Sequence, residues 1–243
     1  MLEHAETFRL QQLNADPESQ SIIFTQAMLA AANMRSNEKV VEYADYALTA
    51  DPNNLSVLIL LAGSNMPDPK KAMEHAQKAA TVPRPATMSD SSWQVTQSRV
   101  HSILGGFYFA ESKWKEANAE FALALKANPK DHVTQYRAGF ASANLMAAAA
   151  QAAQTANTAA AAATTAKANA ITIAELTAKQ EGFSKEALEH RDAAIEFMAK
   201  AAALGGQFAS QAKQLLDGMY QNKHNSLEGE DLLIAQKKTE LGL

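Results

Sequence analysis

The segment SRVHSILGGFYFAESKWKEANAEFALALKANPKD, Ser98–Asp131, decides the fold. On both sides of a break near Glu111, apolar residues recur every three or four positions, which is the period of an amphipathic helix. The segment also places small and large residues where two helices would touch and a proline where the second would stop: Leu104, Gly105, Tyr108, Ala117, Phe121, Ala124 and Pro129. Proline cannot continue a helix. The segment therefore predicts two antiparallel helices joined by a short turn.

The same unit recurs along the chain. Ala15-Asp16-Pro17 and Ala50-Asp51-Pro52 lie 35 residues apart, and Ala127-Asn128-Pro129 repeats the pattern. Each tripeptide follows an apolar segment with helical period, so each predicts the end of a helix. The repeats predicted from this pattern span about 21–54, 55–88, 89–131, and 132–146 together with 184–205.

The seven residues of the opening segment stand at the positions that define the tetratricopeptide repeat (TPR) family, and the segment resembles a repeat of that family. The resemblance implies an all-α, right-handed solenoid of about four helical hairpins, each packed on its neighbours. We expect about eleven helices, no strand and one solenoid domain over residues 1–243, with a truncated repeat represented by a helix over 2–14. The stretch Asp16-Pro17-Glu18-Ser19 before the first repeat also resembles bacterial envelope proteins of this type.

An alanine-rich insertion, 147–183, interrupts the last repeat. Of the 24 residues from Ala147 to Ala170, 15 are alanine, and residues 138–166 carry no charge. A flexible linker is one interpretation. The other follows from the high helix propensity of alanine and from the need to return to the starting point: a hairpin whose outgoing helix runs to about Ala163 and whose returning helix carries Ile171, Ile173 and Leu176.

Two C-terminal capping helices are predicted over 206–243. Gly205-Gly206 is a typical C-terminal helix cap. An apolar helix face follows, formed by Phe208, Ala212, Leu215, Leu216, Met219 and Tyr220. Asn225 with Glu228 predicts a capping box for the last helix, which we expect to end near Thr239.

Composition excludes several classes of function. The net charge is −4 and no lysine or arginine cluster longer than two residues occurs, which argues against a nucleic-acid partner. The insertion lacks the roughly 20 strongly apolar residues that a membrane span needs, so no span is expected. Cysteine is absent, and the start Met1-Leu2-Glu3-His4 is not an apolar leader. The compartment stays open: the bacterial periplasm is favoured if a leader has been removed, and otherwise the cytoplasm.

Catalytic and metal-binding patterns are missing. The sequence has no glycine-rich phosphate loop, and no two of its six histidines lie three or four residues apart, as a helical metal site requires. We therefore expect no enzyme, no cofactor and no metal ion.

The resemblance implies a groove lined by the first helix of each repeat. Further positions on these helices are Ile22, Thr25 and Ser56, and the candidate binding residues are Leu29, Ile59, Arg99, Phe109, Tyr136 and Phe140. An alternative is that several of these residues pack under the C-terminal helices. The groove would suit a peptide with apolar anchors better than one held by its terminal carboxylate.

The function expected from this sequence is a scaffold that binds a peptide or partner protein of unknown identity. The alternatives are a non-catalytic subunit or regulator of an enzyme encoded elsewhere, and a structural protein that self-assembles through the alanine-rich insertion. The oligomeric state is not determined by the sequence.

Overall fold

The chain was examined as a computed structural model, which describes residues 16–63 and 68–243. It divides into two compact units, Met1–Leu104 and Gly105–Leu243. The prediction of one continuous solenoid over residues 1–243 stays a prediction. The predicted helix over 2–14 lies outside the described residues.

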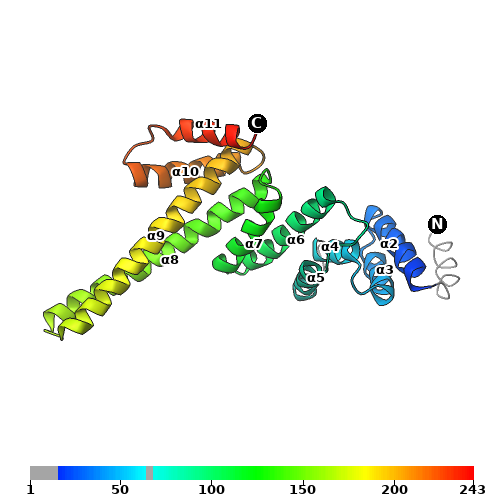
Figure 1. Cartoon of the computed structure of the whole chain (residues 1–243), viewed down its shortest axis with the longest axis horizontal. Coiled ribbons are helices and arrows are strands. Elements are labelled where there is room, and N and C mark those ends of the chain that lie inside the picture. The colour runs from blue at the N-terminus through cyan, green and yellow to red at the C-terminus, as the bar shows by residue number, and fades with distance from the viewer. Residues whose placement is uncertain (1–15, 64–67) are drawn as a thin grey trace. The chain divides into compact units, whose positions relative to one another are not determined.

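The first unit consists of helices packed in adjacent pairs (Figure 1). Its elements are α2 (Pro17–Asn33), α3 (Asn37–Ala50), α4 (Leu55–Gly63), α5 (Pro69–Thr81) and the start of α6 (Asp90–Ala110). α2 packs on α3, and α4 packs on α5. Phe24 and Met28 of α2 fill the core against Ala44 and Ala47 of α3, whose small side chains let the two helices approach closely.

Helix ends in this unit follow from the local sequence. Asp16 and Asp68 each precede a proline at the first helical position and accept backbone N–H groups of the first turn. α3 ends at Ala50, just before Asp51 and Pro52, as the repeat pattern predicts. Ser89 accepts a hydrogen bond from the backbone N–H of Ser92 at 3.2 Å and so caps α6.

The second unit contains the end of α6 and five further helices. They are α7 (Trp114–Ala127), α8 (His132–Thr165), α9 (Ala170–Leu204), α10 (Ala209–His224) and α11 (Glu230–Glu240). α8 packs on α7 and along α9, and α9 also contacts α10 and α11. Gly139 of α8 lies so close to Met198 of α9 that a Cβ atom there would come within 3.0 Å of its side chain.

The all-α prediction is confirmed for the part of the chain that the structure describes, which holds ten helices and no strand. Within that part, no helix is both long and apolar enough to cross a membrane.

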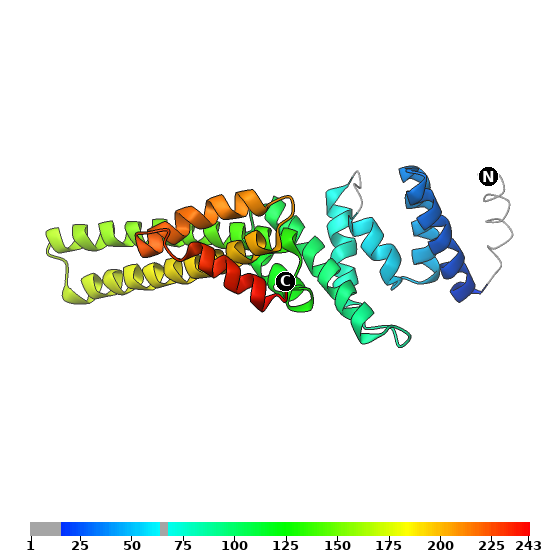
Figure 2. The same cartoon turned by 90° about the horizontal axis from the view of Figure 1, so that it is seen from above.

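The alanine-rich insertion is a helical hairpin, and the flexible-linker interpretation is wrong. α8 continues to Thr165, a short turn follows, and α9 begins at Ala170 with the side chain of Asn169 as its N-cap. The two arms lie side by side (Figure 2). Ala149, Ala153 and Ala156 are buried, because small side chains face the opposite arm.

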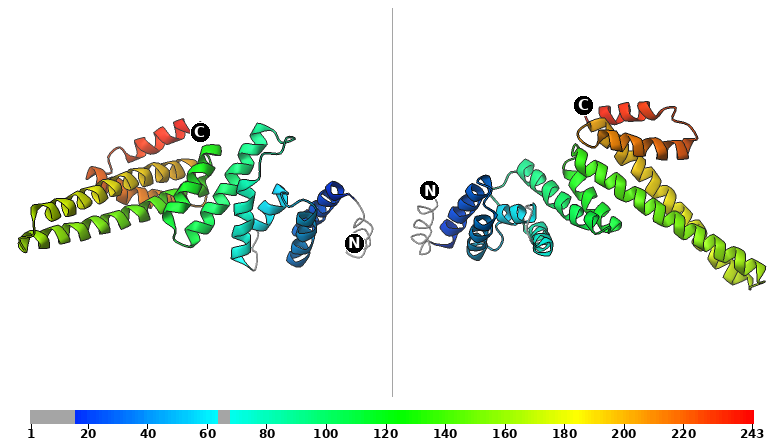
Figure 3. Two further views of the ribbon diagram at one scale, coloured as in Figure 1. Left: turned by 60° about the horizontal axis from the view of Figure 1, so that its bottom comes forward. Right: turned by 180° about the vertical axis from the view of Figure 1, so that it is seen from behind.

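The C-terminal helices are present, but one predicted cap is wrong. Gly205 ends α9 with a φ of 75°, as expected for a glycine cap. α10 and α11 then pack against α9 (Figure 3), and Ala212, Leu216 and Met219 are buried as predicted. Asn225 does not start the last helix: it ends α10 in the left-handed conformation, and α11 begins after Gly229.

The contact between α6 and α7 depends on the absence of a side chain at Gly105. A Cβ atom there would lie 2.5 Å from Cδ1 of Phe121, whose ring is fully buried. We expect Gly105→Leu to lower the free energy of unfolding by about 3 kcal/mol or more, because the core must open to admit the new side chain. Urea unfolding measures this change. Lys115→Ala, at an exposed position of α7, should cost less than about 0.5 kcal/mol. Equal stability of the two variants would contradict the close approach.

The hairpin arms should be dispensable for the folding of the remaining helices. The arms pack mainly on each other, and loop closure depends only weakly on length. Replacement of 147–183 by a short Gly/Ser linker should therefore change the melting temperature by less than about 5 °C. Circular dichroism of the purified variant checks this. Aggregation or loss of the cooperative transition would show that the arms support the rest of the second unit.

Candidate binding surfaces

The six predicted groove residues fall in different units. Leu29, Ile59 and Arg99 belong to the first unit, and Phe109, Tyr136 and Phe140 belong to the second. Leu29 and Arg99 are exposed on their helices, whereas Ile59 is only 7% exposed and is therefore part of the interior. The structure brings Phe109, Tyr136 and Phe140 together in one aromatic cluster.

The clearest apolar surface of the first unit lies on α2. Ile22 is 58% exposed and Leu29 is 38% exposed. They are seven residues apart, which is two helical turns, so both project from the same side of the helix. The opposite side of α2 buries Phe24 and Met28, and that burial fixes which face remains open.

A cavity of about 610 Å³ lies in the second unit and a cavity of about 570 Å³ adjoins Ile22 in the first. The cavity beside Ile22 is formed where the starts of α2 and α4 meet the loop that carries Pro85 and Met88. Ile22, Pro85 and Met88 supply its apolar wall, and Ser56, another predicted groove position, also lines it.

Asn54 holds this wall together. Its amide nitrogen donates to Oγ of Ser21 at 2.9 Å and to Oγ1 of Thr25 at 2.8 Å, and its side-chain oxygen accepts the backbone N–H of Val57 at 3.2 Å. One side chain thus caps α4 and ties its start to α2. Thr25, a predicted groove position, is buried by this network and is not available to a ligand. The sequence pattern did not predict that the residues just before α4 and the loop before α6 would line a cavity. For the first of these segments, the asparagine before an apolar helix is the signal that could have indicated a helix cap at this position.

The aromatic residues of the second unit pack on one another. The ring centroids of Phe109 and Phe140 are 5.6 Å apart, and Trp114 lies 5.2 Å from Phe109, edge to face. Tyr136 stacks on Phe208 at 4.5 Å with an interplanar angle of 5°. Tyr136 therefore packs beneath the start of α10, as the alternative interpretation of the groove residues predicted. Such ring pairs contribute to stability whether or not a ligand binds.

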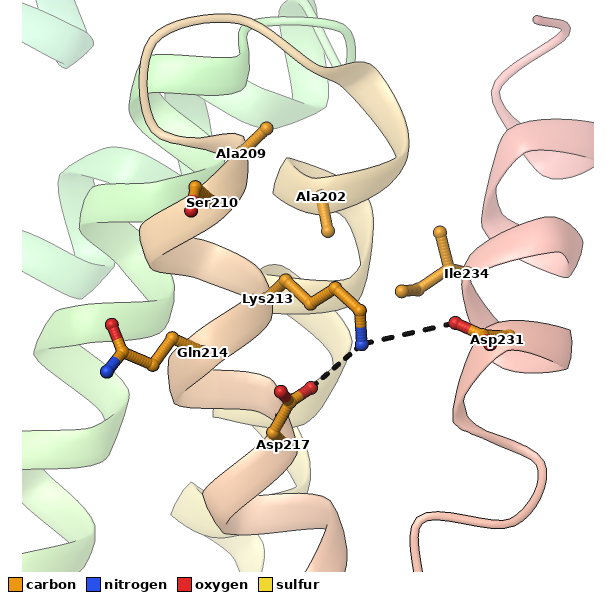
Figure 4. A pocket seen from close by; sticks show the side chains of 8 residues that line it. All are labelled: Ala202, Ala209, Ser210, Lys213, Gln214, Asp217, Asp231 and Ile234. Atoms are coloured by element: carbon orange, nitrogen blue, oxygen red, sulfur yellow. Dashed lines mark hydrogen bonds and ion pairs between the residues drawn. The ribbon is translucent and has the colours of Figure 1, made fainter.

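Three charged side chains from α10 and α11 line the larger cavity (Figure 4): Lys213, Asp217 and Asp231. Nζ of Lys213 lies 2.8 Å from Oε1 of Glu230, 3.0 Å from Oδ1 of Asp217 and 4.0 Å from Oδ1 of Asp231. Hydrogen bonds to Glu230 and Asp217 raise the pKa of the Lys213 ammonium, so it stays charged. Lys213 already occupies the space among the carboxylates, which makes this cluster a tie between two helices.

No metal-binding cluster is found in the described ranges, 16–63 and 68–243. His, Asp and Glu side chains there form no group of three or more that could hold a metal ion. A scan of the sequence against models of known protein families gives no match, and a search of curated proteins finds no significant relative.

The buried Glu230 should make stability depend on pH. Its side chain is only 2% exposed, and burial raises its pKa above the ordinary value of 4.5 although the Lys213 ammonium opposes the shift. The folded state then binds the proton more tightly than the unfolded state, so the contribution of Glu230 to stability is present below pH 4.5 and is lost as the pH rises above it. Glutamine does not titrate.

Relative to Glu230→Gln, the wild-type protein should therefore lose stability as the pH rises from 4.5 through the raised pKa of Glu230. Urea unfolding of both proteins across this range measures the difference. A difference in free energy that does not change with pH would contradict the burial of this carboxyl group.

Proposed function

We propose that this protein is a non-catalytic scaffold that binds a peptide segment of a partner protein along α2 and the adjoining cavity. We further propose that its helix pairs form a TPR-type solenoid. The observation that carries the first proposal is the exposure of Ile22 and Leu29 on one side of α2, next to a cavity with an apolar wall.

The solenoid proposal is supported by the sequence pattern and by local packing. Gly105 and Phe121, two of the seven repeat positions, meet where α6 and α7 approach most closely. α7 ends at Ala127 before Pro129, and α3 ends at Ala50 before Pro52. Within each unit several successive helices pack on each other, α2 on α3, α4 on α5 and α7 on α8, which is the way a solenoid buries its core.

Peptide binding on α2 is favoured by the chemistry of the surface. Full burial of one aliphatic side chain contributes about 1.5–3 kcal/mol, so two anchors on one helix face provide a substantial part of the affinity for a short segment. The cavity gives one side chain of the segment a place to enter. The wall itself is held rigid by the Asn54 hydrogen bonds, which reduces the entropy lost on binding.

The double substitution Ile22→Ala and Leu29→Ala tests the proposal. Random peptides displayed on phage are selected on the full-length protein, and the affinities of the selected peptides are then measured by titration. We expect the double variant to bind them at least about tenfold more weakly, because it removes apolar contact area without changing charge.

Both substituted residues are exposed, so circular dichroism should show unchanged helicity. Leu123→Ala is the matched control, because Leu123 is 47% exposed on α7 of the other unit, and it should leave affinity unchanged. Failure to select any peptide, or equal affinity of the double variant and the wild-type protein, would contradict peptide binding on α2.

A further inference from the structure

The cavity beside Ile22 has an unbalanced charge. Among the described residues that line it, Glu18 and Asp51 are acidic and none is lysine, arginine or histidine. Glu18 is exposed in the first turn of α2. Asp51 lies in the turn before α4, where one carboxylate oxygen, Oδ1, accepts the backbone N–H of Asn53 at 2.9 Å.

The nearest loop cation is already paired. Arg84 precedes Pro85 of the cavity wall, but its guanidinium group forms an ion pair with Asp90 and donates two hydrogen bonds to the carbonyl oxygen of Met88. These bonds fix the loop that forms one side of the cavity. The carboxylate of Asp90 offsets the charge of Arg84, so the arginine does not neutralise Glu18 or Asp51.

The N-termini of two helices bring partial positive charge to the cavity, which opposes the negative charge of the carboxylates. The sign of the electrostatic potential in the cavity depends on which of these charges is larger. The starts of α2 and α4 both reach the cavity. Each helix N-terminus carries the equivalent of roughly +0.5 charge, which gives about +1 for the pair. Glu18 and Asp51 supply two negative charges, and Asp16 at the N-cap of α2 adds a third, since hydrogen bonds from Ser19 lower its pKa. The cavity therefore keeps a net negative potential.

We infer that the peptide bound along α2 places a lysine or arginine in this cavity, next to an apolar residue that contacts Ile22. This inference rests on the proposed function and specifies its partner. The apolar residue packs on Ile22, Pro85 and Met88, while the ammonium or guanidinium group donates hydrogen bonds to the carboxylates of Glu18 and Asp51. A peptide with aspartate or glutamate at that place is repelled.

The amino-acid composition of selected peptides tests the inference. The same phage-displayed random peptides are selected on the wild-type protein and on a variant with both Glu18→Gln and Asp51→Asn. The wild-type protein should select peptides that carry lysine or arginine beside an aliphatic or aromatic residue. The variant should keep the preference for the apolar residue and lose the preference for the cation.

Titration of one selected peptide makes the test quantitative. The probe is the wild-type-selected peptide, compared with an analogue that has glutamine in place of its lysine or arginine. The analogue should bind the wild-type protein roughly tenfold more weakly at about 50 mM salt, and the difference should shrink at about 500 mM because salt screens exposed charges. In the Glu18→Gln, Asp51→Asn variant, both peptides should bind equally.

A matched control removes two negative charges elsewhere in the same unit. Glu38→Gln with Asp45→Asn changes exposed residues of α3 and leaves the cavity intact, so it should preserve the wild-type preference. Asparagine at position 51 retains an oxygen that can accept the Asn53 N–H, and circular dichroism verifies folding. Glu18→Gln alone, on the exposed first turn, provides the test if the double variant does not fold.

The outcomes separate the two proposals. If selected peptides require Ile22 and Leu29 but show no enrichment of lysine or arginine, or show enrichment of acidic residues, the cation inference is wrong and peptide binding on α2 stands. The cation inference is also wrong if the Glu38→Gln, Asp45→Asn control abolishes the preference equally. If no peptide is selected, or if binding does not require Ile22 and Leu29, both proposals are wrong.

Discussion

Close approach between paired helices is the constraint on which the rest of this structure depends. Gly105 admits the ring of Phe121, and Gly139 lies against the side chain of Met198. Alanines such as Ala44 serve the same purpose in the first unit, where they face Phe24 and Met28 in the core between α2 and α3. Because each of these contacts pairs one small residue with one large residue, it fixes the register of its two helices, and a shift by one residue would produce both clashes and voids.

This pairing also determines which surfaces stay open. α2 uses one face for its core, and so Ile22 and Leu29 remain on the other. The side chain of Asn54 joins the turn before α4 to α2 by two hydrogen bonds. These bonds hold the turn in place as one wall of the cavity. In the hairpin, buried alanines of α8 face α9, and their small contact area explains why the arms add length without adding a large core.

Charge distinguishes the two cavities. Around α9, α10 and α11 each buried or half-buried charge has a partner. Nζ of Lys237 lies 2.9 Å from Oε2 of Glu196, and Nζ of Lys223 lies 3.0 Å from Oδ1 of Asp192. Lys213 bridges the carboxylates near it. These pairs hold three helices together and leave little charge for a ligand. Among the described residues that line the cavity at the start of α2, none is a cation, and the remaining negative charge is the reason to assign a cationic ligand group to it.

The local sequence was enough to predict the helical class, the ends of α3 and α7 and the glycine cap at Gly205, because these depend on propensity, proline and glycine within a few neighbouring residues. For the insertion the sequence left a hairpin and a flexible linker open, and the packing of α8 on α9 identifies the hairpin. The sequence did not determine which side chains of a helix are buried or which residues they contact. Only the tertiary structure decided that Ile59 and Thr25 are buried, that Tyr136 stacks on Phe208, and that Asn225 ends one helix instead of starting another. Helical period states which residues share a face, but burial depends on which distant segment covers that face, and no local pattern contains that information.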